Sequence, residues 1–471
     1  MAESAVPLLS SLEAIVGEAN VLTAEADVAP YVSDWRDAFH GRARAVVRPG
    51  STAEVSSVVR CCAQRSAGIV PQGGNTSLCG GATPHATGVE IVLSLARLNR
   101  VRALDPANAT LTVEAGVVLA AVQQAADAAG LLFPLSLAAE GSCTIGGNLS
   151  TNAGGTAVLR YGNARDLVLG VEVVLADGRV WGGLKGLRKD NTGYDLKQLF
   201  LGSEGTLGII TAAVLKLFPK PRVSATAFAA LADVDAAVAL LGELKPALGD
   251  RLTGFELVSR PSVDVTRRIF PAFADPLPGH PWYALIQADD PAADSPLASQ
   301  LEAALATAVE SGTARDATIA QSAAQADALW SLREHIPEAQ RREGLNIKHD
   351  VSLPVSSVPA FLREAQARLD AAFRGVRYVV FGHLGDGNLH YNLVAPPDVA
   401  PAAFLLESPR VHRIVYDLVR ELGGSFSAEH GIGQLKRGEL ARYKSELELE
   451  LMRRVKHALD PGDLLNPGKV V

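Results

Sequence analysis

Hydrophobic residues follow two different patterns along the chain, and the change comes near residue 220. In the first part, short β-branched runs alternate with helical stretches, as in RARAVVRP, AEVSSVVRCCAQR and GIVPQGG, which predict a strand, a helix, and a strand with its turn. From about Ala225 the pattern becomes long Ala- and Leu-rich helices such as AALADVDAAVALLGELKPAL, separated by single strands such as RLTGFELVS and WYALIQAD. The sequence therefore predicts an α+β protein whose first domain is α/β-like.

The segment KLFPKPRVS marks the predicted domain boundary, because Pro219 and Pro221 keep the chain extended on either side of Lys220. We expect one domain at residues 1–220, with its core at about 40–220, and a second at 221–471. A chain of 471 residues is also longer than the ~250 to 300 residues at which a single core stops growing. The second domain is predicted to end in one helical stretch, ELARYKSELELELMRRVKHALD, which Pro461 and Gly462 terminate.

Composition and charge narrow the functional classes. Apolar residues make up 48% of the chain, but no apolar run approaches the ~20 residues of a membrane-spanning helix. The 44 basic and 51 acidic residues give a net charge of −7, which offers no positive field for nucleic acid or an anionic membrane. The four cysteines lack CxxC spacing, and the N-terminus lacks the features of a secretory or transit peptide. We expect a cytoplasmic protein that neither binds nucleic acid nor spans a membrane.

Three glycine-rich segments stand out in the first domain: PQGGNTSLCGG at 71–81, GSCTIGGNLSTNAGG at 141–155 and GSEGTLGII at 202–210. Paired glycines beside Ser, Thr and Asn let the backbone approach a ligand closely and point N–H groups at an anion such as a pyrophosphate. Any one segment alone is explained equally well by tight turns, whereas three together favour a ligand site. No GxGxxG follows a strand, so an ordinary Rossmann dinucleotide site is not predicted.

These segments, together with RYG at 160–162 and GYDLKQLFLGSEGTLGIIT, resemble the FAD-binding domain of the vanillyl-alcohol oxidase type. The second domain resembles the C-terminal domain of the FAD-linked D-2-hydroxy-acid dehydrogenases of that family, and the resemblance extends from about Ala45 to Val471. It implies a two-part FAD-binding domain followed by a cap or substrate domain with an antiparallel sheet and a C-terminal helical segment. The cofactor-binding residues that it implies are Pro71, Gly73, Gly74, Asn75, Thr76, Ser77, Pro134, Ser136, Gly141, Ser142, Thr144, Gly146, Gly147, Asn152, Gly205, Ile210 and Asn466. Members that tether FAD covalently often carry His where this chain has Asn75, and an amide cannot form that bond, so we expect non-covalent FAD.

The segment RYVVFGHLGDGNLHYNLV at 377–394 predicts a β-hairpin, because GDGN is a strong reversal signal between two β-forming runs. Three polar residues of its second strand, Asn388, His390 and Asn392, are two residues apart and therefore point to one face, which is unusual for a core. Downstream, the segment GGSFSAEHGIGQLK contains Glu429 and His430.

Two imidazoles and a carboxylate are a ligand set that suits a catalytic divalent metal, although spacing alone favours a structural role for these histidines. GHxGDGNxHxN and SxEHGxG are signature segments of the resembling dehydrogenases. The resemblance therefore implies that His383, His390 and Glu429 bind a metal, for which zinc is expected and manganese is left open. It also implies that Asn392 contacts the substrate and that His430 is the catalytic base.

Four basic residues lie before the hairpin, in the segment ALWSLREHIPEAQRREGLNIKHDVSLPV, and two of them, Arg333 and Lys348, stand out. Arg333 and Lys348 could both be ordinary solvated residues, but an anionic substrate in a partly dry pocket needs fixed cations. In the branch of the family that oxidises D-2-hydroxyglutarate, an Arg and a Lys at the matching positions bind the distal carboxylate. Pro337 departs from that branch, which often has a hydroxyl residue there. A dicarboxylate substrate is therefore favoured.

Taken together, the motifs predict an FAD-dependent, metal-assisted enzyme that oxidises a D-2-hydroxy acid, with D-2-hydroxyglutarate favoured and 2-oxoglutarate as its product. The C2 hydride is expected to pass to flavin N5 while His430 takes the hydroxyl proton. D-lactate, D-malate and glycolate remain alternative substrates, and a non-catalytic flavin-binding electron-transfer subunit is the alternative of another class. An electron-transferring flavoprotein or a quinone is expected to reoxidise the flavin, and a homodimer is left open.

Overall fold

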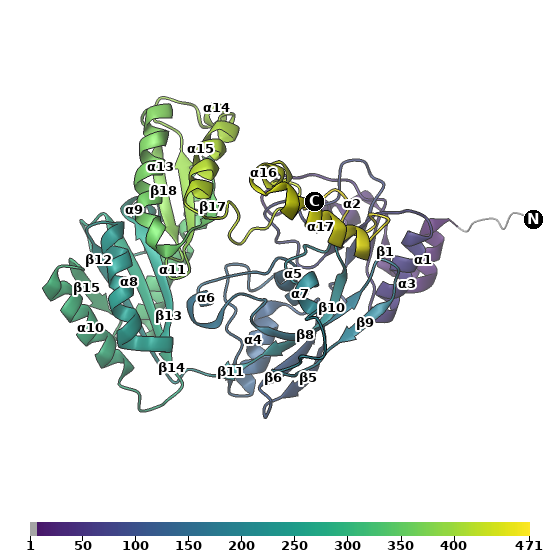
Figure 1. The fold of residues 1–471 in the computed structure, drawn as a ribbon, viewed down its shortest axis with the longest axis horizontal. Helices are drawn as coiled ribbons and strands as arrows, with labels where there is room; N and C mark the ends of the chain where they lie inside the picture. Colours follow the sequence, from purple (N-terminus) through teal and green to yellow (C-terminus); the bar gives the residue numbers. More distant parts are fainter. Residues whose placement is uncertain (1–6) are drawn as a thin grey trace, which may run out of the picture. The chain divides into compact units, whose positions relative to one another are not determined.

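The computed structural model describes residues 7–471, so the first six residues of the predicted 1–220 domain lie outside it. The chain forms two compact units, and Figure 1 labels most of their elements. The first unit contains the residues up to Gly154, then Asn163–Pro219 and Glu429–Val471, and the second contains Gly155–Gly162 and Lys220–Ala428. The chain thus leaves the first unit inside the segment KLFPKPRVS, and it returns to that unit at Glu429.

The first unit is built on two sheets of different character. Strands β2, β3 and β4 are mutually parallel in a four-stranded sheet of order β1-β2-β4-β3, and a five-stranded antiparallel sheet has the order β5-β6-β10-β8-β9. The two-stranded sheet pairs β7 with β11. The strands of this unit are β1 (Val21–Leu22), β2 (Ala45–Val47), β3 (Ile69–Gln72), β4 (Ile91–Ser94), β5 (Val101–Asp105), β6 (Thr110–Glu114), β7 (Leu131–Leu132), β8 (Val168–Val174), β9 (Val180–Gly183), β10 (Ile209–Lys216) and β11 (Phe218–Pro219).

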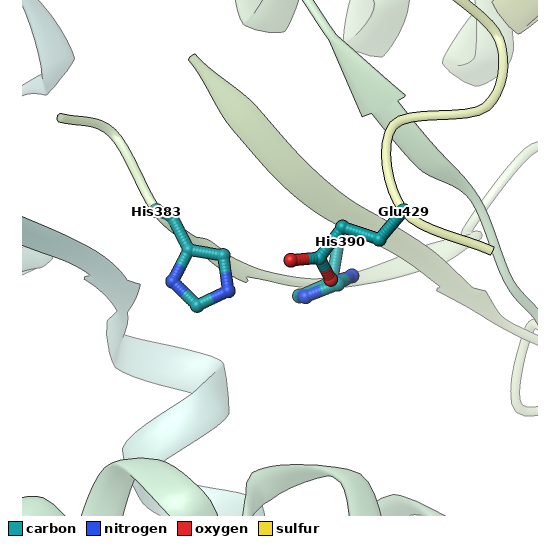
Figure 2. A group of neighbouring side chains, drawn as sticks. All are labelled: His383, His390 and Glu429. Atoms are coloured by element: carbon teal, nitrogen blue, oxygen red, sulfur yellow. The ribbon is translucent and has the colours of Figure 1, made fainter. Parts of the chain in front are cut away.

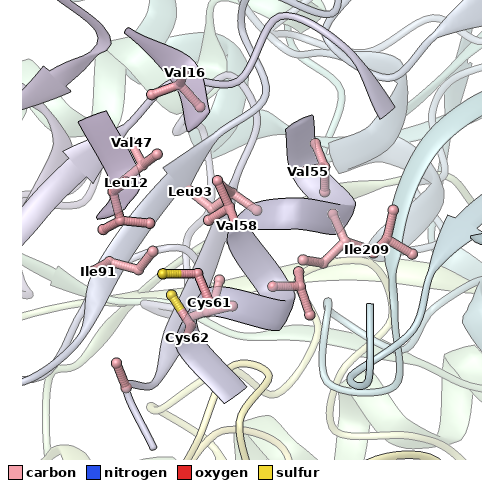
Figure 3. Packing of buried hydrophobic residues seen from close by; sticks show 14 of the residues in the cluster. Leu12, Val16, Val47, Val55, Val58, Cys61, Cys62, Ile91, Leu93 and Ile209 are labelled. Atoms are coloured by element: carbon pink, nitrogen blue, oxygen red, sulfur yellow. The ribbon is translucent and has the colours of Figure 1, made fainter. Parts of the chain in front are cut away.

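Helices α1 (Leu8–Val16) and α3 (Thr52–Ala63) cover the parallel strands, and Figure 3 shows their apolar side chains meeting those of β2 and β4. Ser51 caps α3 by accepting the N–H of Glu54, which fixes where the predicted helix begins. The C-terminal segment joins the same core, because Leu465 forms a bridge with Ile69 of β3. The other helices of this unit are α2 (Glu25–Val28), α4 (Leu119–Ala128), α5 (Ile145–Ser150), α7 (Lys197–Phe200), α16 (Arg437–Tyr443) and α17 (Glu446–Leu459).

The second unit is one antiparallel sheet of order β15-β12-β14-β13-β18-β19-β16, with β17 paired to β19. Helices α9, α11 and α12 pack on one side of it, where Val263, Leu332 and Ile336 meet Val258 and Leu285. The strands are β12 (Val223–Leu231), β13 (Leu252–Ser259), β14 (Trp282–Asp290), β15 (Asp316–Ile319), β16 (Asn346–Ile347), β17 (Asp350–Ser352), β18 (Arg377–Gly382) and β19 (Asn388–Val394). The helices are α6 (Val158–Tyr161), α8 (Val234–Leu248), α9 (Arg260–Ile269), α10 (Leu297–Ser311), α11 (Ala323–Glu334), α12 (Ile336–Glu343), α13 (Val358–Ala372), α14 (Pro401–Leu405) and α15 (Ser408–Glu421).

These elements confirm the predicted mixed α+β fold, with one correction in the tail. The single helical stretch predicted there is two helices, α16 and α17, because Ser445 starts a new helix. Its hydroxyl accepts the N–H of Glu448 while the Glu448 carboxylate accepts the N–H of Ser445, which is a capping box. Across residues 7–471, none of the helices combines the length and the apolar character that crossing a bilayer requires.

Candidate active site

The predicted hairpin is present, with β18 and β19 antiparallel and Phe381 opposite His390. The turn between them is tight: Gly387 has φ of +84°, and a Cβ there would lie 2.0 Å from the carbonyl oxygen of Leu353. The polar residues of β19 are more buried than expected, since Asn388 and Asn392 are 4% and 3% exposed. Burial is tolerated because both amides are hydrogen-bonded, Asn388 to Asp350 and Asn392 to Gln340.

The three residues predicted as metal ligands come together. His383, His390 and Glu429 each offer one ligand atom, and these atoms lie within 4.8 Å of one another (Figure 2). His383 follows β18, His390 lies within β19, and Glu429 follows Ala428, whose N–H donates to the Asp350 carbonyl at 3.2 Å. Asp350 is the cross-strand partner of His390, so this backbone bond holds the chain at Glu429 beside the same strand.

A buried carboxylate that the sequence analysis missed supports this cluster. Glu256 of β13 is fully buried, and its Oε1 lies 2.5 Å from His383 Nδ1. Its Oε2 accepts a hydrogen bond of 2.8 Å from Arg333 Nε and lies 2.7 Å from Arg333 Nη2. Burial alone would raise the pKa of the Glu256 carboxyl, but the facing His383 and Arg333 outweigh it and hold that pKa at about 2. Glu256 is therefore an ionised hydrogen-bond acceptor.

Arg333, predicted to bind the substrate, lies at the end of α11 and is 6% exposed. Its guanidinium also lies over the Phe381 ring, 4.8 Å from the centroid. The contacts to Glu256 use two of the five guanidinium N–H donors, so the group retains donors for a second anion. Pro337 lies in the first turn of α12, where a proline needs no N–H partner and begins a new helix.

Lys348, the second predicted substrate cation, is half-buried between β16 and β17. The predicted substrate residue Asn392 has both ends of its amide on protein partners, because its Oδ1 accepts the His349 N–H at 3.3 Å and its Nδ2 donates to Gln340 Oε1 at 2.8 Å. The substrate roles of Lys348, Asn392 and Arg333 stay predictions.

His430, the predicted base, forms a second acid and imidazole group. One ligand atom each of Asp350, Glu429 and His430 lies within 4.8 Å of the others. The loop that follows His430 is fixed by Glu204, whose carboxylate accepts the N–H groups of Ile432 at 2.7 Å and Gly433 at 2.8 Å. Burial raises the pKa of the Glu204 carboxyl, although these two hydrogen bonds and Lys436 act in the opposite direction. Sequence analysis placed Glu204 inside a glycine motif without giving it a role.

The glycine-rich segments of the first unit press against one another. A Cβ on Gly73 would lie 2.3 Å from Thr144 Oγ1, and one on Gly74 would lie 2.0 Å from the Ser142 carbonyl oxygen. Gly205, with φ of +73°, would place a Cβ 3.2 Å from Pro71. The structure thus brings together residues of all three motifs that were predicted to hold the cofactor.

The other predicted cofactor residues are distributed around these contacts. Asn75, Asn152 and Asn466 each have positive φ, and each side-chain amide bonds to the protein backbone: Asn75 to Pro30 and Ser33, Asn152 to Arg165, and Asn466 to Gly81 and Glu204. Ser77 accepts the Gly81 N–H, and Ile210 lies buried in β10. The remaining residues are in loops or in the first turn of α5: Thr76, Pro134, Ser136, Gly141, Gly146 and Gly147.

Two observations show that these residues fit a bound phosphate-containing group such as FAD. Within residues 7–471, the buried Thr144 Oγ1 and Asn75 Oδ1 form no hydrogen bond with the protein. Gly141 has open space at its Cβ position, whereas Gly73 and Gly74 leave no room for a side chain. Unpaired buried polar atoms beside side-chain-free backbone are what a polar ligand requires. The two imidazoles and carboxylate likewise fit a divalent metal by their chemistry.

The fold and this glycine-lined region define an FAD-linked oxidoreductase. Residues 43–182 match the family model "FAD binding domain", and residues 220–470 match "FAD linked oxidases, C-terminal domain". The chain belongs to the FAD-linked oxidase family, of the vanillyl-alcohol oxidase type, and it is an FAD-binding enzyme, as the sequence motifs predicted.

Curated relatives extend this similarity over almost the whole chain. The chain is 40% identical to a D-2-hydroxyglutarate dehydrogenase of Xanthomonas citri pv. viticola, covering 98% of this chain and 97% of that protein. It is 39% identical to the mitochondrial D-2-hydroxyglutarate dehydrogenase of Bos taurus, covering 98% and 83%. It is 34% identical to the D-2-hydroxyglutarate–pyruvate transhydrogenase DLD3 of Saccharomyces cerevisiae, covering 98% and 94%. Because one of these relatives is mitochondrial, the predicted cytoplasmic location stays a prediction.

Solved structures support the fold. p-Cresol methylhydroxylase with substrate bound matches with a TM-score of 0.77 at 18% identity, covering 98% of this chain and 96% of that one. 4-Ethylphenol oxidase from Gulosibacter chungangensis matches with a TM-score of 0.74 at 20% identity and the same coverage. At these identities the likeness concerns the fold alone.

Proposed function

We propose that this enzyme oxidises D-2-hydroxyglutarate to 2-oxoglutarate with non-covalent FAD and a divalent metal, for which zinc is the first candidate and manganese the second. The observation that carries the proposal is the convergence of His383, His390 and Glu429 next to His430. The names of the relatives, at 34% to 40% identity over nearly the full chain, support the substrate.

Three residues would hold the metal: His383, His390 and Glu429. A divalent metal bound there would withdraw charge from the substrate's 2-hydroxyl and carboxylate and lower the pKa of the hydroxyl. FAD, when bound, supplies the hydride acceptor at its N5 atom.

The chain's own groups then have separate tasks. His430 accepts the proton of the 2-hydroxyl, which requires a neutral imidazole within hydrogen-bond reach of that oxygen. Lys348 binds the distal carboxylate of a five-carbon diacid, together with those guanidinium N–H donors of Arg333 that do not contact Glu256. These contacts fix which end of the substrate reaches His430. Asn392 completes the substrate contacts. An electron-transferring flavoprotein or a quinone reoxidises the enzyme, which acts in the cytoplasm.

A substrate panel tests this function. The holoenzyme is assayed with an artificial electron acceptor and with D-2-hydroxyglutarate, D-lactate, D-malate and glycolate, each with and without a chelator. The proposal expects the highest kcat/KM for D-2-hydroxyglutarate and loss of turnover on chelation. A higher kcat/KM for D-lactate would make D-lactate the substrate instead. Absence of turnover with every acid would favour the alternative of a non-catalytic electron-transfer subunit.

The variant His430→Ala separates the base from the metal ligands. It should keep metal and FAD while turnover falls by ~10²- to 10⁴-fold, the range that a general base contributes. His383→Ala should instead lose metal. Full activity of His430→Ala would remove that residue from the reaction.

A further inference from the structure

Glu256 of β13 contacts His383 directly, carboxylate oxygen to ring nitrogen. The register of the sheet brings the two together, because Leu257 of β13 is the strand partner of Gly382, the residue before His383. Both side chains are nine-tenths or more buried, at 0% and 8% exposed, and the two contacting atoms are 2.5 Å apart. The contact is therefore a built feature of the second unit.

The contact determines the tautomer of His383. Arg333, which can only donate, occupies Glu256 Oε2, and Glu256 Oε1 faces His383 Nδ1 at 2.5 Å. A neutral imidazole therefore carries its hydrogen on Nδ1 and donates it to the carboxylate. In that tautomer the lone pair is on Nε2, which is the form that binds a metal. Without an acceptor at Nδ1, the ring would be free to rotate or to carry its hydrogen on Nε2.

Arg333 keeps this carboxylate ionised inside the protein. A buried carboxylate without a cation would be costly, and Arg333 supplies the cation at 2.7 Å from Oε2. The guanidinium is itself held on the other side by the Phe381 ring. Arg333, Glu256 and His383 thus form a chain of contacts in which the cation balances the charge of the carboxylate.

We propose that Glu256 is a positioning residue that holds His383 in its metal-binding tautomer and orientation, and that Arg333 acts on the metal through Glu256. The inference rests on the metal site of the proposed function and goes beyond it, because it assigns a role to two residues before any substrate is bound.

The test measures the affinity for Zn²⁺, and separately for Mn²⁺, of the FAD-loaded full-length protein without substrate, by competition with a chromophoric chelator. Removing a group that orients a metal ligand typically costs 10- to 100-fold in metal affinity. Glu256→Gln, which keeps the size but loses the charge, should show that loss with unchanged FAD content. Arg333→Met should also lower the affinity for the metal. Because the two groups are in contact, the double variant should lose less binding free energy than the sum of the two single losses.

The matched control is Glu114→Gln in the first unit. Glu114 is also fully buried and pairs with two arginines, Arg100 and Arg102. Within residues 7–471, none of the three contacts a proposed metal ligand. It should leave metal affinity unchanged. Should Glu256→Gln not fold, Glu256→Asp keeps the charge for Arg333 but is one methylene shorter, and it should show the same weakening.

The outcomes separate the two proposals. Wild-type metal affinity in folded Glu256→Gln or Glu256→Asp would overturn the positioning role and leave the proposed function intact. Wild-type protein that binds neither metal would overturn the metal site itself. Unchanged metal affinity in Arg333→Met would overturn the role of Arg333 at the metal and leave it only its proposed role in substrate binding.

Discussion

Glu204 holds the backbone of Gly433 through a hydrogen bond of 2.8 Å, and its other carboxylate oxygen holds the N–H of the preceding residue, Ile432. The same carboxylate explains a glycine of the SAEHGIG motif, because a Cβ on Gly431 would lie 2.7 Å from Glu204 Oε1. Two motifs more than two hundred residues apart thus form one contact in the first unit, and His430 immediately precedes the loop that this contact fixes.

The first prediction follows from this contact. Glu204→Ala releases the loop after His430, and displacement of a reacting group by ~1 Å can cost ~100-fold, so kcat should fall by up to that factor while metal content stays constant. Glu204→Gln retains one acceptor oxygen, so its kcat should lie between those of the wild type and Glu204→Ala. Steady-state kinetics, together with measured FAD and metal contents, check it. Glu450→Ala, at an exposed glutamate of α17, is the control and should be silent.

The second prediction concerns how the flavin is held. The family resemblance predicts that Asn75 stands where members that tether FAD often carry His, and its Nδ2 donates to the Pro30 and Ser33 carbonyl oxygens. Acid precipitation should therefore release FAD into the supernatant, where its absorbance is measured. Flavin that remains with the pellet would show a covalent bond.

The third prediction tests substrate length. If Lys348 binds the distal carboxylate as proposed, Lys348→Met removes a charge-assisted hydrogen bond worth ~1.5 to 3 kcal/mol, which is roughly ten- to hundredfold in kcat/KM. The loss should fall on D-2-hydroxyglutarate, whereas D-lactate has no distal carboxylate and its turnover should change little. Arg342→Met, at an exposed arginine of α12, serves as the control. Equal damage to both substrates would place Lys348 away from the distal carboxylate and make D-lactate the leading substrate.

The fourth prediction uses a buried lysine in the first unit. Burial lowers the pKa of Lys469 to about 8, although Glu90 acts in the opposite direction, and its Nζ donates to Asn466 Oδ1 at 2.7 Å. In the unfolded chain its pKa is about 10.5. Between these values the unfolded state binds more protons, so the lysine's contribution to the free energy of unfolding rises with pH, by about 3 kcal/mol over the window.

Urea unfolding of the wild type and of Lys469→Met at pH 7.5 and 10.5 measures this contribution as a difference. The wild type should gain stability relative to the variant as the pH rises, whereas Lys189→Met, at an exposed lysine, should show no such trend. A difference that is independent of pH would contradict the lowered pKa.

The residues that sequence analysis identified are those whose local chemistry is distinctive. The GDGN turn between two β-forming runs predicted the hairpin. The family resemblance, and not spacing, implied the set His383, His390 and Glu429, whose ligand atoms the structure brings together. Glu256 was not found because a single glutamate in the strand RLTGFELVS has no pattern of its own. Its role depends on the pairing of strands β13 and β18, which are more than a hundred residues apart in the sequence. No local pattern encodes such a pairing.

The tail shows a signal that was available and overlooked. Ser445 and Glu448 have the S-x-x-E spacing of a capping box, which marks a helix start inside the stretch that was predicted as one helix. The last segment joins the core of the first unit because Leu465 pairs with Ile69, far away in the sequence. Local sequence could not predict this pairing.

The central claim is that D-2-hydroxyglutarate reduces the flavin only when the metal site is filled. It is tested by following the visible absorbance of the oxidised flavin under anaerobic conditions, with no electron acceptor present. D-2-hydroxyglutarate should bleach the metal-loaded protein, should fail to do so after chelation with FAD still bound, and should bleach it again once Zn²⁺ or Mn²⁺ is restored; the L-enantiomer should have no effect. Equally fast bleaching by D-2-hydroxyglutarate in protein shown to be free of metal would contradict the account.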